Sequence, residues 1–503
     1  MPVKSPIPDV DVPHVDIATY IFAKAQARVD ALTAAGISEP PLVIDAVSGR
    51  SLCFSEIKRN TLAIARGLSA LIPRDPTSKI ENNEQSICID RAVLVLLHND
   101  VMYSAIHFGI LMAGCTHVAL NPRASVEELA AKLKEIGLTS VVAAFVDAEA
   151  VDALESAAEI TGVELQKQAI FTISNDKPLT LDALVQENID KPFTPYEFTP
   201  EKTATLPALV MYSSGTSGRA KGIEFEVTAC LEAIERYKIT HICGTPKILH
   251  TILHETTKVD ACTVRMRDRP EAEFRIGSVI VVACGGTSLP LVLRCRYSEY
   301  FGGALVMVGY GQTETSSIIA GNSWGILAAP GAVGVLCPNS VAKVIDANGN
   351  ETDKLGELCI SGPHVMKGYV GNVKSPIVDG FLHTGDYARL SADGHVYLHG
   401  RLADVVHTAQ GLIIPTDVEA MLADNPAIID LAVVGVGAKG EAHAVVFLVL
   451  ADSDVPKNEL LADISQFIKA KTANPHIACR EITNLPRNLA GKVIPHLLLD
   501  QLN

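Results

Sequence analysis

The chain has 503 residues, of which 48% are hydrophobic and 20% charged, and its formal net charge is −15. This length exceeds one ordinary domain, and the composition is typical of a soluble protein with several globular parts and a large buried core. The acidic balance argues against a nucleic-acid groove or an anionic membrane surface as a partner. The 11 cysteines occur without a Cys-x-x-Cys pair, which favours reduced thiols in a reducing compartment.

The ends of the chain carry no targeting signal of a familiar kind. The first residues lack a basic-then-apolar segment, and residues 501–503 read Gln-Leu-Asn rather than a Ser-Lys-Leu peroxisomal address. A cytoplasmic location is therefore expected. Residues 101–120 contain no Asp, Glu, Lys or Arg, a length that would admit a membrane span, but His107 and His117 interrupt the segment. We interpret it as a buried helix followed by a strand.

Apolar periodicity in the first third alternates between the helical and the strand type. It predicts helices at residues 54–71, 101–114, 126–136 and 148–160, and strands at 92–97, 115–120, 140–146 and 169–173. Ser125 and Glu128 form a capping pair at the start of the third helix. Such alternation predicts a parallel, helix-covered sheet, and the missing Gly-x-Gly-x-x-Gly motif argues against a nicotinamide-binding domain.

An apolar run at residues 208–212 leads into Tyr-Ser-Ser-Gly-Thr-Ser-Gly-Arg-Ala-Lys-Gly at 212–222. Glycines allow φ > 0 and close approach to a ligand, hydroxyls and a lysine suit phosphate, and the stretch lacks the Walker ending. A plain flexible connection is the alternative on composition alone. The candidate phosphate-binding residues are Ser213, Ser214, Gly215, Thr216, Ser217, Gly218 and Lys221.

Further short stretches follow at the ends of predicted strands. An apolar run at residues 275–283 leads into Gly285, Gly286 and Thr287, and a strand at 304–309 leads into Tyr310, Gly311, Gln312, Thr313 and Glu314. An aromatic, a hydroxyl and a carboxylate at a strand end suit a nucleotide, although a strand-to-turn junction with a capping threonine has the same pattern. Three more short stretches follow later in the chain: Thr384-Gly385-Asp386, Gly400-Arg401 and Gly491-Lys492.

In this order, these stretches resemble the motifs of the adenylate-forming (AMP-binding) superfamily, which includes acyl-CoA synthetases, 4-coumarate–CoA ligases, luciferases and adenylation domains. The resemblance implies an α/β fold with a large N-terminal domain of helix-covered sheets, residues 1–400. A small α+β C-terminal domain, residues 401–503, would follow on a hinge. In that last part the pattern predicts strands at 428–436 and 443–450 and a helix at 457–471.

The resemblance also implies roles for the candidate residues. Residues 213–221 would hold phosphates, Gly285, Gly286 and Thr287 would lie under the adenine, and Tyr310, Gly311 and Gln312 would line the nucleotide. Thr313 would contact the α-phosphate and Glu314 would hold Mg²⁺. Asp386 and Arg401 would bind the ribose. Lys492 would be the catalytic lysine, whose charge can offset negative charge developing at the α-phosphate.

The implied reaction has two steps. ATP and a small carboxylic acid form an acyl-adenylate, and coenzyme A then takes the acyl group; a carrier protein is the alternative acceptor. The chain departs from the usual pattern at Ala220, where proline is common, and at His407, where lysine is common. The N-terminal layout is most similar to the 4-coumarate–CoA ligase and medium-chain acyl-CoA synthetase branch.

One departure is larger, because the resemblance implies that a block of several dozen residues is missing after Gly222. A helix and a Lys-Ile-Thr ending follow almost at once, at residues 230–240. The missing block would carry part of the acid pocket and some core strands. Its loss predicts unpaired sheet edges and uncovered apolar faces, and it leaves a defective or non-catalytic family member as the alternative function.

Overall fold

The computed structural model describes most of the chain, in segments separated by gaps. The described residues are 2–12, 15, 17–72, 89, 91–173, 179–196, 207–212, 227–285, 289, 291–322, 326, 328–370, 374–423, 425–438, 441–451, 455–487 and 493–502. None of the helices in these ranges is long and apolar enough to cross a membrane.

By their internal contacts the residues form two compact units. The N-terminal unit comprises Asp11–Ser213 and Gly368–Ser375. The second unit comprises Met1–Val10, Ser214–Lys367 and Pro376–Asn503. The predicted domain boundary at residues 400 and 401 lies inside the second unit and stays a prediction.

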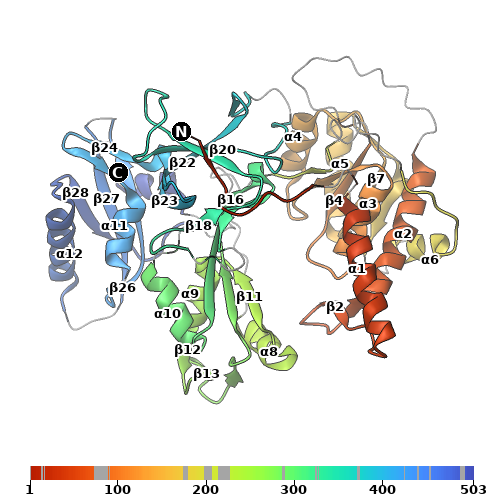
Figure 1. Ribbon diagram of the computed structural model, residues 1–503, viewed down its shortest axis with the longest axis horizontal. Helices are drawn as coiled ribbons and strands as arrows, with labels where there is room; N and C mark the ends of the chain where they lie inside the picture. The colour runs from red at the N-terminus through yellow and green to blue at the C-terminus, as the bar shows by residue number, and fades with distance from the viewer. Residues whose placement is uncertain are drawn as a thin grey trace. The chain divides into compact units, whose positions relative to one another are not determined.

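The N-terminal unit is built on a five-stranded parallel sheet with the order β10-β5-β4-β7-β9. Alternate residues of the central strand point to opposite faces, so one face packs against α1, α2, α3 and α6 and the other against α4 and α5 (Figure 1). The bounds are β4 Ala92–Leu96, β5 Thr116–Ala119, β7 Ala143–Val146, β9 Ile170–Thr172, β10 Leu209–Val210, α1 Ile17–Ala34, α2 Phe54–Leu71, α3 Tyr103–Met112, α4 Val126–Ile136, α5 Val151–Thr161 and α6 Leu181–Asn188.

The predicted parallel, helix-covered sheet is thus confirmed. Helix α4 begins and ends where predicted, and its capping box is formed, with the Glu128 amide donating to Ser125 Oγ at 3.2 Å. Residues 101–120 contain a buried helix followed by a strand, as interpreted. The predicted strand at 140–146 is instead two short strands, β6 Ser140–Val141 and β7, which pair with different partners.

The second unit contains an eleven-stranded mixed sheet among its described residues, with the path β1-β19-β20-β22-β23-β18-β17-β16-β15-β11 and β21 beside β22. Strands β11, β15 and β16 are parallel, and the remaining pairs are antiparallel. The bounds are β1 Val3–Lys4, β11 His241–Gly244, β15 Val281–Cys284, β16 Leu305–Gln312, β17 Ser317–Gly321, β18 Gly334–Leu336, β19 Val341–Ile345, β20 Gly356–Ser361, β21 Ile377–Val378, β22 Phe381–Leu390 and β23 His395–Arg401.

Three helices, α8 Val227–Tyr237, α9 Pro246–Glu255 and α10 Leu291–Tyr300, lie with the parallel strands (Figure 1). A small antiparallel sheet adjoins them, formed by β12 Thr256–Lys258, β13 Thr263–Met266 and β14 Glu273–Arg275. Residues 275–283 form one apolar run in the sequence. In the structure a turn at Gly277 and Ser278 divides this run between β14 and β15.

The last hundred residues form a small α+β part. Strands β26 and β27 pair antiparallel, and β28 joins β27 in parallel. The predicted strands at 428–436 and 443–450 and the helix beginning at Lys457 are confirmed. The bounds are β24 Val406–Thr408, β25 Gly411–Ile413, α11 Pro415–Leu422, β26 Ile428–Val436, β27 His443–Leu450, α12 Lys457–Thr472, β28 Ile477–Glu481 and α13 Pro495–Leu499.

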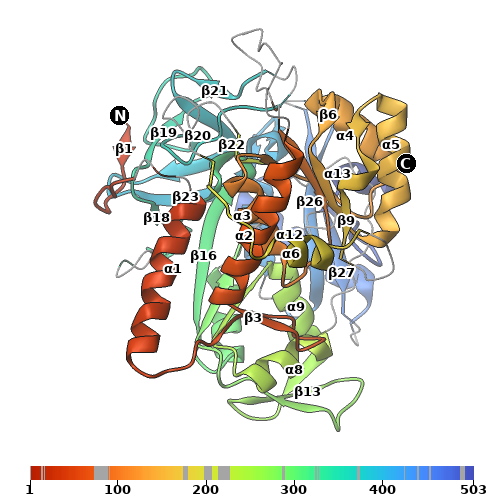
Figure 2. The same cartoon turned by 90° about the vertical axis from the view of Figure 1, so that its right-hand side faces the viewer.

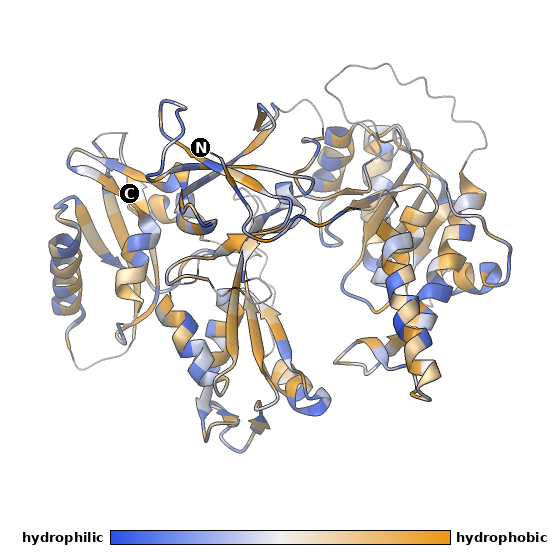
Figure 3. Ribbon diagram, in the orientation of Figure 1, coloured by the Kyte–Doolittle hydropathy of each residue, from blue (hydrophilic) through white to orange (hydrophobic). Residues whose placement is uncertain are grey.

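The strands that flank the predicted missing block lie at sheet ends. Strand β10 ends the sheet of the N-terminal unit and β11 ends the described part of the larger sheet. One face of β11, β15 and β16 packs against α8, α9 and α10. The residues of these three strands are largely hydrophobic, as their colours show (Figure 3). Leu305 on β16 is 46% exposed, and Ile318 on the neighbouring strand β17 is 56% exposed. Parallel sheets are normally covered on both faces. The uncovered apolar face that the loss after Gly222 would leave stays a prediction.

Two histidines meet inside the N-terminal unit. His107 Nδ1 and His117 Nδ1 are 2.9 Å apart, so one ring donates to the other. His117 is 1% exposed, and its Nε2 has no partner in the described structure. Burial, reinforced by the neighbouring His107, lowers the pKa of His117 from 6.5 to about 3. Protonation of His117 would therefore place a charge on a buried group.

We predict that His117 makes the fold sensitive to acid. Its pKa is lowered by folding, so its contribution to stability is complete above about pH 6.5 and is lost as the pH falls toward 3. At about pH 5 the free energy of unfolding should be about 2 kcal/mol lower than at neutral pH. His117→Gln cannot titrate, so its melting temperature should fall less between about pH 7.5 and about pH 5 than that of the wild type.

The matched control is His443→Gln, which removes an exposed histidine on β27. That variant should keep the acid sensitivity of the wild type. Equal acid sensitivity of His117→Gln and the wild type would contradict the assignment.

Candidate active site

Tyr310 lies on β16, in a buried cluster of the second unit. The Tyr310 ring is buried with β17, β18 and β20 side chains. Its hydroxyl donates to Asp386 Oδ2 at 2.6 Å. Burial first, and then the Asp386 carboxylate, raises the pKa of Tyr310, so the phenol is a neutral hydrogen-bond donor at any physiological pH.

Asp386 lies on β22 opposite Arg401 on β23. Arg401 Nε is 3.2 Å from Asp386 Oδ1, and the Asp386 side chain is 10% exposed while that of Arg401 is 45% exposed. Arg401 Nη1 also donates to the Thr384 carbonyl at 3.1 Å. The carboxylate is therefore held on one oxygen by a buried phenol and on the other by a guanidinium that reaches solvent.

The Thr384-Gly385-Asp386 turn is fixed by hydrogen bonds of its own. Thr384 Oγ1 donates to the Leu358 carbonyl at 2.7 Å and accepts from the Asp386 amide at 3.1 Å. Gly385 has φ +67°, a conformation that favours glycine, and its amide donates to Glu357 Oε1 at 3.1 Å. Sequence reasoning missed Glu357, because only the pairing of β20 with β22 brings it to the turn.

The two glycine-bearing strand ends lie side by side, because β15 and β16 are parallel neighbours. A Cβ added at Gly285 would lie 3.5 Å from the Gly309 carbonyl oxygen. Gln312 has a buried Nε2 with no partner in the described residues. An unpaired buried amide costs free energy, so it indicates that a polar ligand group belongs beside this strand end.

Thr313 and Glu314 follow on a short 3-10 turn, η3 Thr313–Thr315. The Glu314 carbonyl accepts from the Met366 amide at 2.8 Å, which ties the turn to the chain after β20. A carboxylate on such a turn fits Mg²⁺, which takes oxygen ligands from one or two carboxylates together with phosphates.

Part of the predicted site lies outside the described residues. These members are Ser213, Ser214, Gly215, Thr216, Ser217, Gly218, Lys221, Gly286, Thr287 and Lys492. The described members that the structure brings together are Tyr310, Asp386 and Arg401, and Gly285 lies beside Gly309 at the neighbouring strand end.

Comparison with known proteins decides the family. The AMP-binding enzyme profile matches residues 87–228 and 223–370, more than half of the chain. The chain belongs to the AMP-binding enzyme family. A 4-coumarate–CoA ligase of Pinus taeda is 23% identical to this AMP-binding enzyme, covering 91% of this chain and 90% of its own length.

Two further relatives extend the comparison. A phenylacetyl-CoA ligase of Aspergillus niger is 24% identical, with 98% of each chain covered. The crystal structure of ATP-bound MatB from Rhodopseudomonas palustris superposes with a TM-score of 0.74 at 19% identity, covering 96% of this chain and 98% of that one. This likeness confirms the predicted α/β fold of the adenylate-forming type.

The alignments also bear on the missing block. The profile matches the chain in two separate pieces, and these pieces overlap at residues 223–228, directly after Gly222. The alignment with the phenylacetyl-CoA ligase runs over 567 positions, which is 64 more than the 503 residues of this AMP-binding enzyme. The relative therefore has at least that many positions without a counterpart here, and the profile is interrupted where the sequence analysis locates the loss.

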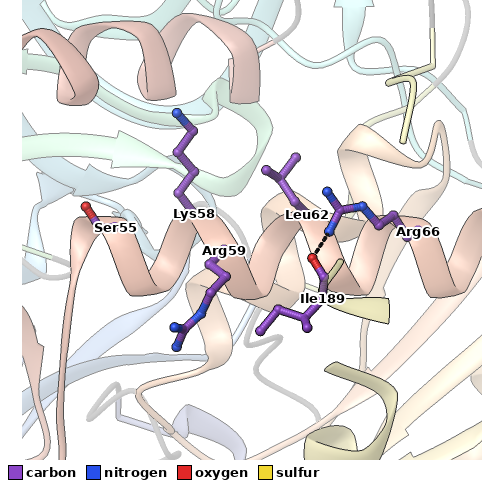
Figure 4. Close-up of a pocket in the computed structure, with 6 residues that line it drawn as sticks. All are labelled: Ser55, Lys58, Arg59, Leu62, Arg66 and Ile189. Carbon is purple, nitrogen blue, oxygen red and sulfur yellow. Dashed lines mark hydrogen bonds between the residues drawn. The ribbon is translucent and has the colours of Figure 1, made fainter. Parts of the chain in front are cut away.

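A separate hollow of about 300 Å³ lies on α2 of the N-terminal unit, lined by Ser55, Lys58, Arg59, Leu62, Arg66 and Ile189 (Figure 4). Its three cations do not converge, since Lys58 and Arg59 point to opposite sides of the helix (Figure 4). Lys58 Nζ donates to Gln26 Oε1 at 2.8 Å, and Arg66 Nη1 donates to the Ile189 carbonyl at 2.6 Å. The hollow is a structural feature of α2 and α6 rather than an anion site.

We predict that Asp386→Ala weakens ATP and AMP binding alike, because both ligands carry the ribose. Loss of a charge-assisted acceptor should cost about 1.5–3 kcal/mol. Calorimetric titration of both nucleotides measures it. Asp393→Ala, which removes an exposed carboxylate from the turn between the same two strands, is the control and should bind as the wild type does. Equal affinity of Asp386→Ala and the wild type would rule out the ribose role.

Proposed function

We propose that this AMP-binding enzyme is an acid–thiol ligase that converts a carboxylic acid and ATP to an acyl-adenylate and then transfers the acyl group to coenzyme A. The observation that carries the proposal is the convergence of Tyr310 and Arg401 on the Asp386 carboxylate. This arrangement creates an oriented acceptor beside strand ends that bear glycines and an unpaired amide. A nucleotide matches it, because a ribose offers two hydroxyl donors.

Each described residue then has a defined task in the first step. A carboxylate can accept about four hydrogen bonds, which allows Asp386 to accept from protein donors and from ribose hydroxyls together. Gly285 would lie under the base, as the resemblance implies, and Gln312 Nε2 would offer the base a donor. Tyr310 would keep Asp386 in position through its hydroxyl, and its ring, which is 7% exposed, leaves little of its face for stacking on a base.

The reacting end depends on residues at the turn and on the C-terminal loop. Thr313, which is exposed, would donate to the α-phosphate, and Glu314 would hold Mg²⁺, an ion that neutralises charge on the phosphates when bound. Residues 213–221 would cradle the phosphates. Lys492 would offset the negative charge that develops when the carboxylate attacks, on a C-terminal domain that moves about a hinge near residue 401.

For the acid we propose an aryl or arylalkyl carboxylic acid, since relatives that match over nearly their whole length are named for coumarate and phenylacetate. Free coenzyme A is the proposed acceptor, and a carrier protein is the alternative. We further propose the cytoplasm as the location, in keeping with the free thiols in the described structure.

A second function, binding of nucleotide without turnover, is favoured by one specific observation. The two profile matches meet at residues 223–228, the point in the sequence where the resemblance implies that part of the acid pocket is missing. The nucleotide contacts lie elsewhere, on β16, β22 and β23. The two halves of the reaction can therefore be separated by experiment.

Lys492→Ala should abolish acid-dependent exchange of pyrophosphate into ATP in a form of the enzyme that catalyses it, while ATP binding stays nearly unchanged. The charge acts mainly in the transition state, so the loss should be of several kcal/mol, on the order of a thousandfold in rate. Lys469→Ala, on an exposed turn of α12, is the matched control. Exchange that survives in Lys492→Ala at the control rate would refute the role.

We also predict that the 503-residue chain forms little or no CoA ester, whereas the chain with the corresponding segment of the Aspergillus niger relative inserted after Gly222 is active. Positioning governs such reactions, and a displacement of about 1 Å can cost on the order of a hundredfold in rate. Hydroxamate and CoA-ester assays over a panel of aryl and medium-chain acids, with a melting curve for each form, provide the measurement. Brisk turnover by the shorter form would contradict this view of the missing block.

A further inference from the structure

A group of three different metal-binding side chains lies where β20 and β22 pair, with the cysteine buried and the other two partly exposed. Glu357, Cys359 and His383 each present one ligand atom, and these atoms all lie within 4.8 Å of one another. It is the one such group of three among the described residues. None of the three has a task in the nucleotide chemistry proposed above, apart from the support that Glu357 gives to Gly385.

The pairing of the strands brings the group together. Strands β20 and β22 are antiparallel neighbours (Figure 2), and Cys359 lies directly opposite His383. The register shifts between Glu357 and Cys359, which brings the Glu357 carboxylate to the same imidazole. His383 Nδ1 is 3.0 Å from Glu357 Oε2, and the Cys359 thiol is buried with only a weak contact, 3.9 Å, to the Glu357 carbonyl.

We propose that Glu357, Cys359 and His383 form a zinc site. A thiolate, an imidazole and a carboxylate are the three ligand types that Zn²⁺ takes, and three protein ligands leave the fourth tetrahedral position for water. Mg²⁺ and Ca²⁺ prefer all-oxygen ligands and do not fit a buried sulfur. The separation of the ligand atoms requires only small side-chain movements to reach the 2.0–2.3 Å distances, roughly, of zinc coordination.

A nearby cation limits the affinity. Lys343 on β19 lies opposite Cys359. Its Nζ is 3.8 Å from Glu351 and 4.4 Å from the centre of the Phe381 ring, both of which partly compensate its charge. Repulsion between this ammonium and a bound ion should weaken the site. Removal of the Lys343 charge should therefore strengthen metal binding, which is opposite in sign to removal of a ligand.

Metal binding at this site should stabilise the neighbouring turn of Thr384, Gly385 and Asp386. Glu357 Oε1 accepts from the Gly385 amide, and Asp386 is the next residue. An ion held by Glu357 and His383 would fix both flanks of that turn. Since anything that binds only the folded state stabilises it, Zn²⁺ should raise the melting temperature, with no need for catalytic activity.

Titration of the metal-free full chain with Co²⁺ tests the site. The expected result is a thiolate-to-cobalt charge-transfer band with the visible bands of a four-coordinate ion, saturating at one equivalent. Cys359→Ala should abolish the thiolate band, and His383→Gln and Glu357→Gln should weaken binding at least about tenfold. Cys115→Ala, another buried thiol, and His395→Gln, which breaks a His–Asp pair of 3.1 Å that lacks a thiol, are matched controls and should titrate as the wild type.

Lys343→Gln should tighten Co²⁺ binding, and Zn²⁺ should raise the melting temperature of the wild type but not of Cys359→Ala. The proposal would be overturned if the wild type showed no thiolate band, or if the band persisted in Cys359→Ala. The group would then be only a His383–Glu357 pair beside a buried thiol. Should Cys359→Ala fail to fold, His383→Gln decides, because its half-exposed imidazole can be replaced with little disturbance. Unchanged affinity in that variant would equally overturn the site.

Discussion

The buried carboxylate of Asp386 is the constraint on which the candidate site depends. A carboxylate removed from water is costly unless charged and hydrogen-bonding partners surround it. Here Tyr310 supplies a short hydrogen bond from β16, and Arg401 supplies a guanidinium from β23. The same two contacts join β16 to the antiparallel pair β22 and β23, and Tyr310 and Asp386 are 76 residues apart in the sequence. The stability of this part of the sheet and the geometry of the candidate nucleotide acceptor are therefore coupled.

The large sheet positions these residues because its strands are parallel at one end, from β11 to β16, and antiparallel in the rest. Its parallel strands carry glycines at or near their ends, and its antiparallel strands fix the Asp386 turn by register. One face of the parallel strands packs against α8, α9 and α10, whereas Leu305 on β16 is 46% exposed. The candidate nucleotide-binding residues Tyr310, Asp386 and Arg401 lie on β16, β22 and β23, whereas β11, the first described strand after the predicted loss, ends the sheet.

Much of the fold was predictable, because local signals govern it. The capping pair at Ser125 and the periodicity of α2, β26 and β27 predicted these elements to the residue. Motif order located Tyr310, Asp386 and Arg401 without revealing that the Tyr310 hydroxyl holds Asp386. That contact joins residues 76 apart, and the group of Glu357, Cys359 and His383 depends on a register shift, so no local pattern could predict either.

The central claim is that Tyr310 prepares Asp386 for a nucleotide, and a double-mutant cycle tests it most directly. AMP affinity would be measured by calorimetry for the wild type, Tyr310→Phe, Asp386→Ala and the double variant. If the phenol acts through the carboxylate, the two changes should be non-additive, with a coupling free energy of roughly 1–2 kcal/mol. Additive effects, with a coupling free energy near zero, would contradict the account, because the Tyr310 hydroxyl would then contribute to binding independently of Asp386.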